Sequence, residues 1–257
     1  MARETARLRH VEESMGTVFS FDIRGVRDRP RVRAGLQAAV ASLHRADEIF
    51  STYREDSQIS RLNRGELTLS DCITEVVEVL DLCAEAERES AGWFTARYAG
   101  GVDPTGLVKG WAVERAARMI ASSGASSVCL NGGGDIQLLG GPWRVGIADP
   151  LRPGELATVV ETGTGLGVAT SGPAERGCHV LDPHTGKAPA DGMASVTVVC
   201  QEGITVADTR ATAAYAMGEP AREWLESLPG TEGFAVTPYG ETWATSGFHR
   251  HVAAVAA

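Results

Sequence analysis

The middle of the chain, residues 102–136, constrains the fold more than any other segment, because a helical pattern stands between two glycine-containing loops: VDPTGLVKGWAVERAARMIASSGASSVCLNGGGDI. Apolar residues recur at helical spacing over residues 111–122, which predicts one amphipathic helix. Gly106, Lys109 and Gly110 come just before that helix. A short apolar strand follows and leads into the second glycine turn. We therefore expect a helix packed against a strand.

Two interpretations of this segment remain open. A helix N-terminus presents unpaired N–H groups and a partial positive charge, and glycine lets the backbone approach a ligand closely. Both halves of the segment are therefore able to hold phosphate. The alternative is a purely structural helix and strand, since glycine-rich turns are common. The segment contains neither a P-loop sequence nor a dinucleotide-binding glycine turn that opens a helix.

Composition places the chain among ordinary globular proteins. The chain is 43% apolar and 22% charged, as is usual for a globular protein. Its length of 257 residues is enough for one large domain or two small ones. The net charge of −9 argues against a general nucleic-acid-binding protein, because such a protein needs a basic surface. We predict a single interlocked α+β domain over residues 1–257, with mixed or antiparallel sheets flanked by helices.

Cysteine usage and the first residues predict a cytoplasmic protein. The five cysteines are odd in number and lack C-x-x-C spacing, which fits free thiols in a reducing compartment. The opening sequence MARETARLRHVEESMG is charged and has no apolar core, unlike a secretory or lipoprotein signal. The sequence has no apolar run long enough for a membrane span, so we expect none.

Hydrophobic periodicity predicts helices in both halves of the chain and strands mainly in the second half. The expected helices cover residues 30–53, 73–90, 111–122, 207–217 and 219–228. One or two strands are expected in the opening segment, to about Asp22, around residues 14–17. Further strands are expected at residues 128–130, 135–139, 143–148, 157–161, 166–169, 178–181, 195–200, 231–236 and 241–245. The polar segment 51–63 is expected to connect the first two helices.

Asp208 and Thr212 stand four residues apart on a predicted helix, a spacing that places both side-chain oxygens on one face. A carboxylate and a hydroxyl arranged in this way form half of a site for a hard cation such as Mg²⁺. The alternative is structural: the aspartate complements the helix dipole and the threonine donates to a backbone carbonyl. The spacing alone leaves both interpretations open.

Other candidate residues are equally ambiguous when taken singly. His179 precedes a turn, and its imidazole suits general-base chemistry if it faces a site, although a structural histidine is as good an explanation. Tyr53, Trp93 and Phe94 suit stacking on an aromatic ligand, but they also suit an apolar core.

Most of these candidate residues belong to a series of eight short motifs that follow one another along the chain. They are MGT (residues 15–17), FSTYREDSQISRLN (50–63), DPTGLVKGWAVE (103–114), NGGGDI (131–136), WRVGIADP (143–150), ATSG (169–172), HVLDPHTG (179–186) and ADTRATAAYAMG (207–218). In this order they resemble the ApbE family, the FAD:protein FMN transferases, over nearly the whole chain.

The resemblance implies a transferase that uses FAD as its substrate and requires Mg²⁺. Such an enzyme cleaves the FAD pyrophosphate, attaches FMN to a Thr or Ser hydroxyl of an acceptor flavoprotein, and releases AMP. It implies His179 as catalytic base, and Asp208, Thr212 and the Gly106 carbonyl as metal ligands. The positions that match the contacts to flavin, adenosine or phosphate are Met15, Tyr53, Trp93, Phe94, Thr95, Asp103, Lys109 and Val180.

The chain also departs from the family pattern. Only residues 98–102 separate the Phe94–Arg97 segment from Asp103, where the family has several dozen residues, and this bears on the contacts of residues 93–95. Asp-Pro-Thr-Gly at 103–106 replaces the usual Asp-Leu-Gly-Gly, and Glu114 stands where aspartate is typical. Two alternative functions remain open: an FAD pyrophosphatase with water as nucleophile, and a flavin-binding protein without catalysis.

Overall fold

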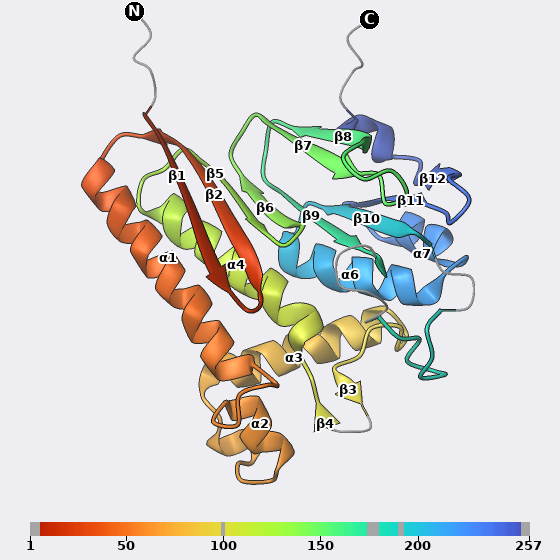
Figure 1. Ribbon diagram of the computed structural model, residues 1–257, viewed down its shortest axis with the longest axis horizontal. Helices are drawn as coiled ribbons and strands as arrows, with labels where there is room; N and C mark the ends of the chain where they lie inside the picture. Colours follow the sequence, from red (N-terminus) through yellow and green to blue (C-terminus); the bar gives the residue numbers. More distant parts are fainter. Residues whose placement is uncertain (1–5, 99–100, 174–179, 190–192, 253–257) are drawn as a thin grey trace, which may run out of the picture.

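An eight-stranded antiparallel sheet forms the centre of the molecule (Figure 1). The computed structural model describes residues 6–98, 101–173, 180–189 and 193–252. The strands lie in the order β1-β2-β5-β6-β9-β10-β11-β12. Their bounds are β1 (Ala6–Ser14), β2 (Thr17–Val26), β5 (Ser127–Gly132), β6 (Asp135–Leu139), β9 (Leu166–Ser171), β10 (Ser195–Cys200), β11 (Thr231–Val236) and β12 (Thr242–Ala244).

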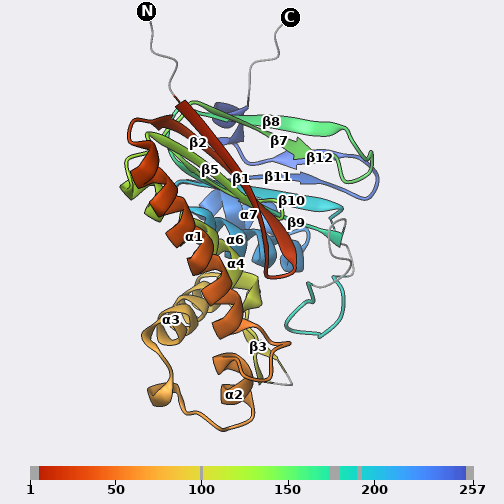
Figure 2. The same ribbon diagram turned by 60° about the vertical axis from the view of Figure 1, so that its left-hand side comes forward.

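Three helices cover one face of this sheet: α1 (Arg29–Phe50), α4 (Thr105–Ser122) and α6 (Ile204–Met217) (Figure 2). Helix α4 packs against both α1 and α6 and also against β5 and β6. Helix α6 is alanine-rich, and ten of its fourteen residues are buried, because it contacts α4 as well as β9 and β10. The larger apolar core therefore lies between this helical layer and the sheet.

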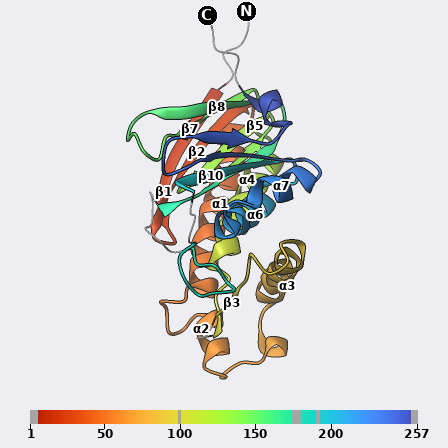
Figure 3. The same cartoon turned by 90° about the vertical axis from the view of Figure 1, so that its right-hand side faces the viewer.

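The opposite face carries a second, smaller core. The hairpin of β7 (Trp143–Ala148) and β8 (Leu156–Thr162) and the short 3₁₀ helix η2 (Phe248–His251) contribute to it, together with residues of β6, β9, β10 and β11. Figure 3 shows α6 and α7 (Ala221–Ser227) on one side of the sheet and the β7–β8 hairpin on the other. This arrangement confirms the α+β class, whereas the single-domain range 1–257 stays a prediction.

A smaller group of elements lies beyond the N-terminal end of α4 (Figure 1). It comprises α2 (Gln58–Asn63), η1 (Leu69–Asp71), α3 (Thr74–Glu89), β3 (Arg97–Tyr98) and β4 (Gly101–Val102). Strands β3 and β4 pair antiparallel and form a small ribbon. The side chain of Asn63 bonds to both backbone groups of Val102, with distances of 2.8 Å each, and so extends the ribbon as a strand would. None of the described helices is long and apolar enough to cross a membrane.

Most predicted elements are confirmed, and three of the differences bear on the candidate site. The helix predicted over 111–122 begins earlier, at Thr105, so Gly106, Lys109 and Gly110 lie inside it. The polar segment 51–63 contains α2, which begins after the Ser57 cap. Of the strand predicted at 178–181, the first two residues lie outside the described residues, and the other two are not in a strand.

Candidate active site

The first two turns of α4 are shaped by glycine. The backbone N–H of Thr105 donates to the carboxylate of Asp103 over 3.0 Å, and this bond supports the start of the helix. Gly106 and Gly110 are four residues apart and therefore lie on one face of α4. A Cβ atom at Gly110 would lie 3.0 Å from the carbonyl oxygen of Ile204 and 3.1 Å from Oδ2 of Asp208. The missing side chain therefore lets α6 approach α4 closely.

The same approach brings together three charged side chains, which we name the Lys109 cluster: Lys109, Asp135 and Asp208. The ammonium of Lys109 forms an ion pair with Asp135, and its Nζ lies 3.6 Å from Oδ2 of Asp208. Asp135 is 1% exposed and Asp208 is 6% exposed. Charges that are this deeply buried are costly unless they are compensated, so a cluster of this kind marks a functional site more often than a stabilising one.

A tight hairpin places Asp135 in the cluster. Residues Gly133 and Gly134 connect β5 to β6, and both have positive φ angles, 60° and 89°. The side chain of Asn131 accepts a hydrogen bond of 2.9 Å from the backbone N–H of Gly134 and closes the turn. A two-residue turn of this geometry suits the twist of an antiparallel hairpin. Sequence reasoning identified the turn but missed the role of Asp135, because only the fold brings this residue to Lys109.

The start of α6 is fixed to the sheet, and this places Asp208. The buried side chain of Gln137 on β6 accepts a hydrogen bond of 2.8 Å from the backbone N–H of Ile204. The side chain of Glu114, on α4, accepts bonds from the backbone and the hydroxyl of Thr205, at 3.0 and 2.6 Å. Asp208 follows Ile204 by one helical turn. Contacts of the preceding turn with β6 and α4 therefore help to fix the position of Asp208.

Thr212 follows Asp208 by one turn on α6 and is half-buried. Helical spacing places it on the same face as Asp208, as the sequence predicted. Within the described part of the chain, no group of three or more His, Cys, Asp or Glu side chains lies close enough to hold a metal ion. A metal site here would therefore depend on hydroxyl and carbonyl oxygens in addition to carboxylate.

Two of the predicted aromatic residues, Phe94 and Trp93, contact other parts of the protein. The ring of Phe94 is 2% exposed, and its Cε2 atom lies 3.4 Å from the position of a Cβ on Gly106, so it packs beneath the first turn of α4. The rings of Trp93 and His184 form a T-shaped pair, with centroids 4.6 Å apart and ring planes at 87°. Trp93 therefore contacts the segment that leads from Val180, which is itself 9% exposed.

The remaining predicted residues lie in varied surroundings. Tyr53, just after α1, is 96% exposed. Met15 has a φ of 50° in the turn between β1 and β2 and packs against the larger core. The hydroxyl of Thr95 donates to Glu87 at 3.3 Å and accepts from the backbone of Arg97 at 3.0 Å, so it serves local structure. His179 lies outside the described residues.

Comparison with known proteins identifies the family. The model of the ApbE family matches residues 15–102 and 95–235. A FAD:protein FMN transferase of Rhodobacter capsulatus is 30% identical over 167 residues, which are 60% of this chain and 31% of that protein. One from Vibrio cholerae is 33% identical over 132 residues, 46% of this chain and 39% of that protein. The matching regions thus span only 31% and 39% of the length of these two relatives.

Solved structures agree with this result at the level of the fold. The ApbE protein of Thermotoga maritima superimposes with a TM-score of 0.84 at 21% identity, and the match covers 97% of this chain and 100% of that protein's chain. The flavin transferase ApbE from Vibrio cholerae gives a TM-score of 0.79 at 22% identity, with 96% and 99% coverage. Because the family model also accounts for well over half of the sequence, this chain belongs to the ApbE family.

Proposed function

We propose that this chain is an Mg²⁺-dependent FAD:protein FMN transferase. In the reaction, a Thr or Ser hydroxyl of an acceptor flavoprotein attacks the phosphorus atom on the FMN side of the pyrophosphate. A phosphoester bond to FMN forms, the bond to the AMP oxygen breaks, and AMP leaves. The observation that carries the proposal is the buried Lys109 cluster at the start of α4, in a chain that belongs to the ApbE family.

The cluster and the helix end provide electrostatic complementarity to a pyrophosphate. Asp135 holds the Lys109 ammonium, which fixes its direction before a substrate arrives. The N-terminal end of α4 adds the positive end of the helix dipole nearby. Pyrophosphate cleavage depends on such positioned positive charge, because negative charge on the phosphate oxygens must be stabilised in the transition state.

The residues around Asp208 fit Mg²⁺. The carboxylate of Asp208, the hydroxyl of Thr212 and the carbonyl of Gly106 offer the oxygen ligands that this ion prefers. Two buried carboxylates and one ammonium also leave the three groups of the cluster with an excess negative charge, which a cation would offset. When bound, Mg²⁺ would neutralise the pyrophosphate oxygens and stabilise the leaving phosphate.

Because of the family resemblance, we assign to His179 the role of the base that takes the proton from the acceptor hydroxyl. Imidazole is suited to this step because its pKa lies near neutrality. On the same resemblance, we assign the contacts to flavin and adenosine to Met15, Tyr53, Trp93, Phe94, Thr95, Asp103 and Val180. The nearly complete exposure of Tyr53 leaves its ring accessible to a planar ligand. The cytoplasmic location expected from the sequence stays a prediction.

The test is incubation of the purified protein with FAD and Mg²⁺, with and without an acceptor flavoprotein. A transferase would add the mass of FMN to the acceptor and form AMP in step, and EDTA would stop both. AMP and free FMN without a modified acceptor would indicate a pyrophosphatase. FAD that is bound but stays intact under all conditions would refute catalysis.

A matched pair of variants tests the metal assignment. Asp208→Asn keeps the size of a buried side chain but removes its charge, and we expect the Mg²⁺-dependent rate to fall by roughly a hundredfold or more. Asp81→Asn makes the same chemical change on the exposed face of α3 and should leave the rate unchanged. Equal activity of the two folded variants would contradict the role of Asp208.

A further inference from the structure

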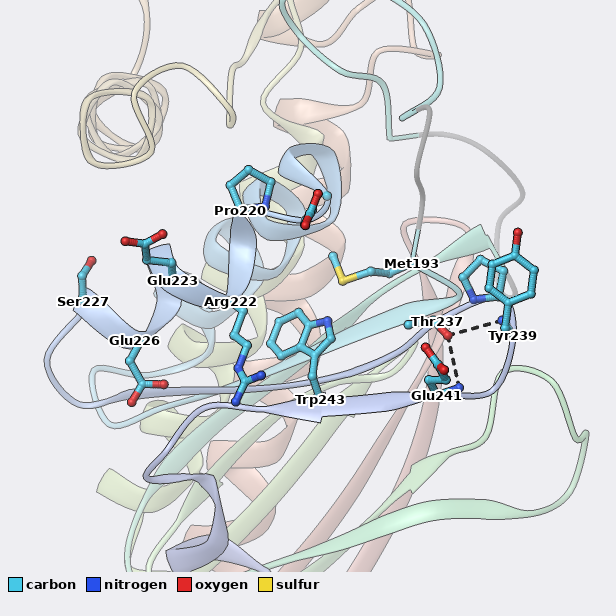
Figure 4. Close-up of a pocket in the computed structure, with 13 residues that line it drawn as sticks. Met193, Pro220, Arg222, Glu223, Glu226, Ser227, Thr237, Tyr239, Glu241 and Trp243 are labelled. Atoms are coloured by element: carbon cyan, nitrogen blue, oxygen red, sulfur yellow. Dashed lines mark hydrogen bonds between the residues drawn. The ribbon is translucent and has the colours of Figure 1, made fainter.

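A groove outside the Lys109 cluster contains none of the residues assigned to the reaction above. Helix α7 forms one wall, the β11–β12 turn forms the other, and the side chains of Met193 and Trp243 lie between them (Figure 4). We name it the α7 groove. Its volume is about 1100 Å³, which exceeds that of a typical small-molecule pocket and suits a peptide segment.

The rim of the α7 groove is predominantly acidic. Glu219, Glu223, Glu226 and Glu241 line it together with one arginine, Arg222. All five side chains belong to exposed residues, so the rim is accessible to solvent. Hydrogen bonds from the hydroxyl and backbone of Ser246 hold the pKa of Glu226 below its usual range. The groove therefore favours a cationic occupant.

The bottom of the α7 groove supplies apolar contact for such an occupant. Trp243, on β12, is half-buried, and Met193 is 6% exposed. An indole ring attracts lysine and arginine through its π face, and the aliphatic stems of these residues pack on apolar surface. In Figure 4 the ring of Trp243 lies between the side chains of Arg222 and Met193, with the carboxylate of Glu241 farther along the groove.

The α7 groove is also connected to the proposed active site through α6. This helix carries Asp208 and Thr212, ends at Met217, and continues into Gly218 and Pro220, which line the groove. The six residues from Thr212 to Gly218 correspond to about 9 Å along a helix axis. A few extended residues of a bound chain would span that distance, at about 3.3 Å each.

We propose that the α7 groove binds a lysine- or arginine-containing segment of the acceptor flavoprotein, close in its sequence to the hydroxyl that receives FMN. This inference rests on the proposed function, because it names the partner of that reaction. Glu223 and Glu241 pair with the cationic groups, and Trp243 and Met193 contact their stems. Such rim charges act mainly on the rate of association and on the choice of partner.

Peptide binding tests the groove directly. The probes are a fluorescein-labelled heptapeptide that alternates lysine with leucine and its counterpart that alternates glutamate with leucine. The groove variant is Glu223→Lys/Glu241→Lys, and the matched control is Asp81→Lys/Glu85→Lys on α3. All four carboxylates are on exposed residues, and no hydrogen bond of the described residues uses them, so both variants change the net charge equally without removing an internal contact.

We expect the unmodified protein to bind the lysine peptide in preference to the glutamate peptide. The groove variant should bind the lysine peptide at least about tenfold more weakly, and the control variant within about threefold of the unmodified protein, since reversing distant exposed charges has little effect on a local contact. Equal weakening by the two variants would overturn the proposal. Self-association of the protein that Trp243→Ala abolishes would also overturn it, by making a second copy the occupant.

FAD binding, followed by quenching of flavin fluorescence, separates this inference from the proposed function. Both double variants should bind FAD as the unmodified protein does, because none of the four positions lies in the Lys109 cluster. A protein that binds the lysine peptide but never binds FAD would refute the transferase. A protein that binds FAD and treats the two peptides alike would refute the groove.

Discussion

We expect the same substitution, glycine to alanine, to have opposite effects on stability at two positions of α4. At Gly110 a Cβ would lie 3.0 Å from a backbone carbonyl of α6 and 3.1 Å from two side-chain atoms of Asp208, none of which is the end of a long flexible side chain. At Gly106 it would lie 3.4 Å from the ring of Phe94, which is an ordinary van der Waals contact. Alanine should therefore fit at the second position and not at the first.

The magnitudes follow from two opposing terms. Replacing glycine by alanine in a helix gains up to about 1 kcal/mol from backbone propensity. Overpacking at a tight contact costs about 1–3 kcal/mol. We expect Gly106→Ala to be stabilised by about 0.5 kcal/mol, since it lies in the first turn, and Gly110→Ala to be destabilised by about 1–2 kcal/mol. The two variants should differ by about 2 kcal/mol.

Urea unfolding measures this difference. The midpoints of the two variants should move in opposite directions with an unchanged slope, because neither change alters the surface exposed on unfolding. Gly110→Ala should also lower the rate of FAD cleavage, since α6 must move away together with Asp208. A Gly110→Ala variant at least as stable as Gly106→Ala would refute the close approach of α4 and α6.

Three further perturbations test other contacts. Asp135→Asn weakens one of the contacts that direct the Lys109 ammonium, so AMP formation should fall about tenfold while FAD affinity changes less. Arg210→Lys replaces a buried fork that bonds Glu89 at 3.0 and 2.7 Å, and calorimetry should show a loss of about 2–3 kcal/mol. Burial raises the pKa of the Cys83 thiol from 9.0 to about 12, which favours the neutral thiol in the folded state, so stability is retained below pH 9 and falls as pH rises toward 12. Denaturant unfolding at several pH values should show that Cys83→Ala removes about 1.4 kcal/mol per pH unit of this alkaline decline.

The strands of the second half were predictable because local signals define them. The predicted ranges 135–139, 143–148, 195–200 and 231–236 have the same bounds as β6, β7, β10 and β11. Each is a short apolar run bounded by glycine, proline or polar residues, and a run of that length is too short for a typical buried helix. The alanine-rich helix that became α6 was recognisable for a similar reason.

The start of α4 was not predictable from such signals. Pro104 together with two glycines lowers the local helix propensity, so the pattern indicated a loop before residue 111. In the folded chain the helix nevertheless begins at Thr105, and Gly110 inside it packs against α6, about a hundred residues later in the chain. The role of Asp135 was missed for the same reason, because Lys109 is its partner only through the fold.

The Lys109 cluster shows why motif order was more informative than any single motif. Lys109, Asp135 and Asp208 come from three separate segments, and each has a plausible structural explanation alone. Their meeting depends on backbone contacts: the glycine turn before Asp135, the bond from Ile204 to Gln137, and the missing side chain at Gly110. Contacts of this kind constrain the sequence at glycines and at Gln137 rather than at the charged residues. The sequence therefore specifies the site largely through the residues that position its elements, and only partly through the three charged residues of the Lys109 cluster.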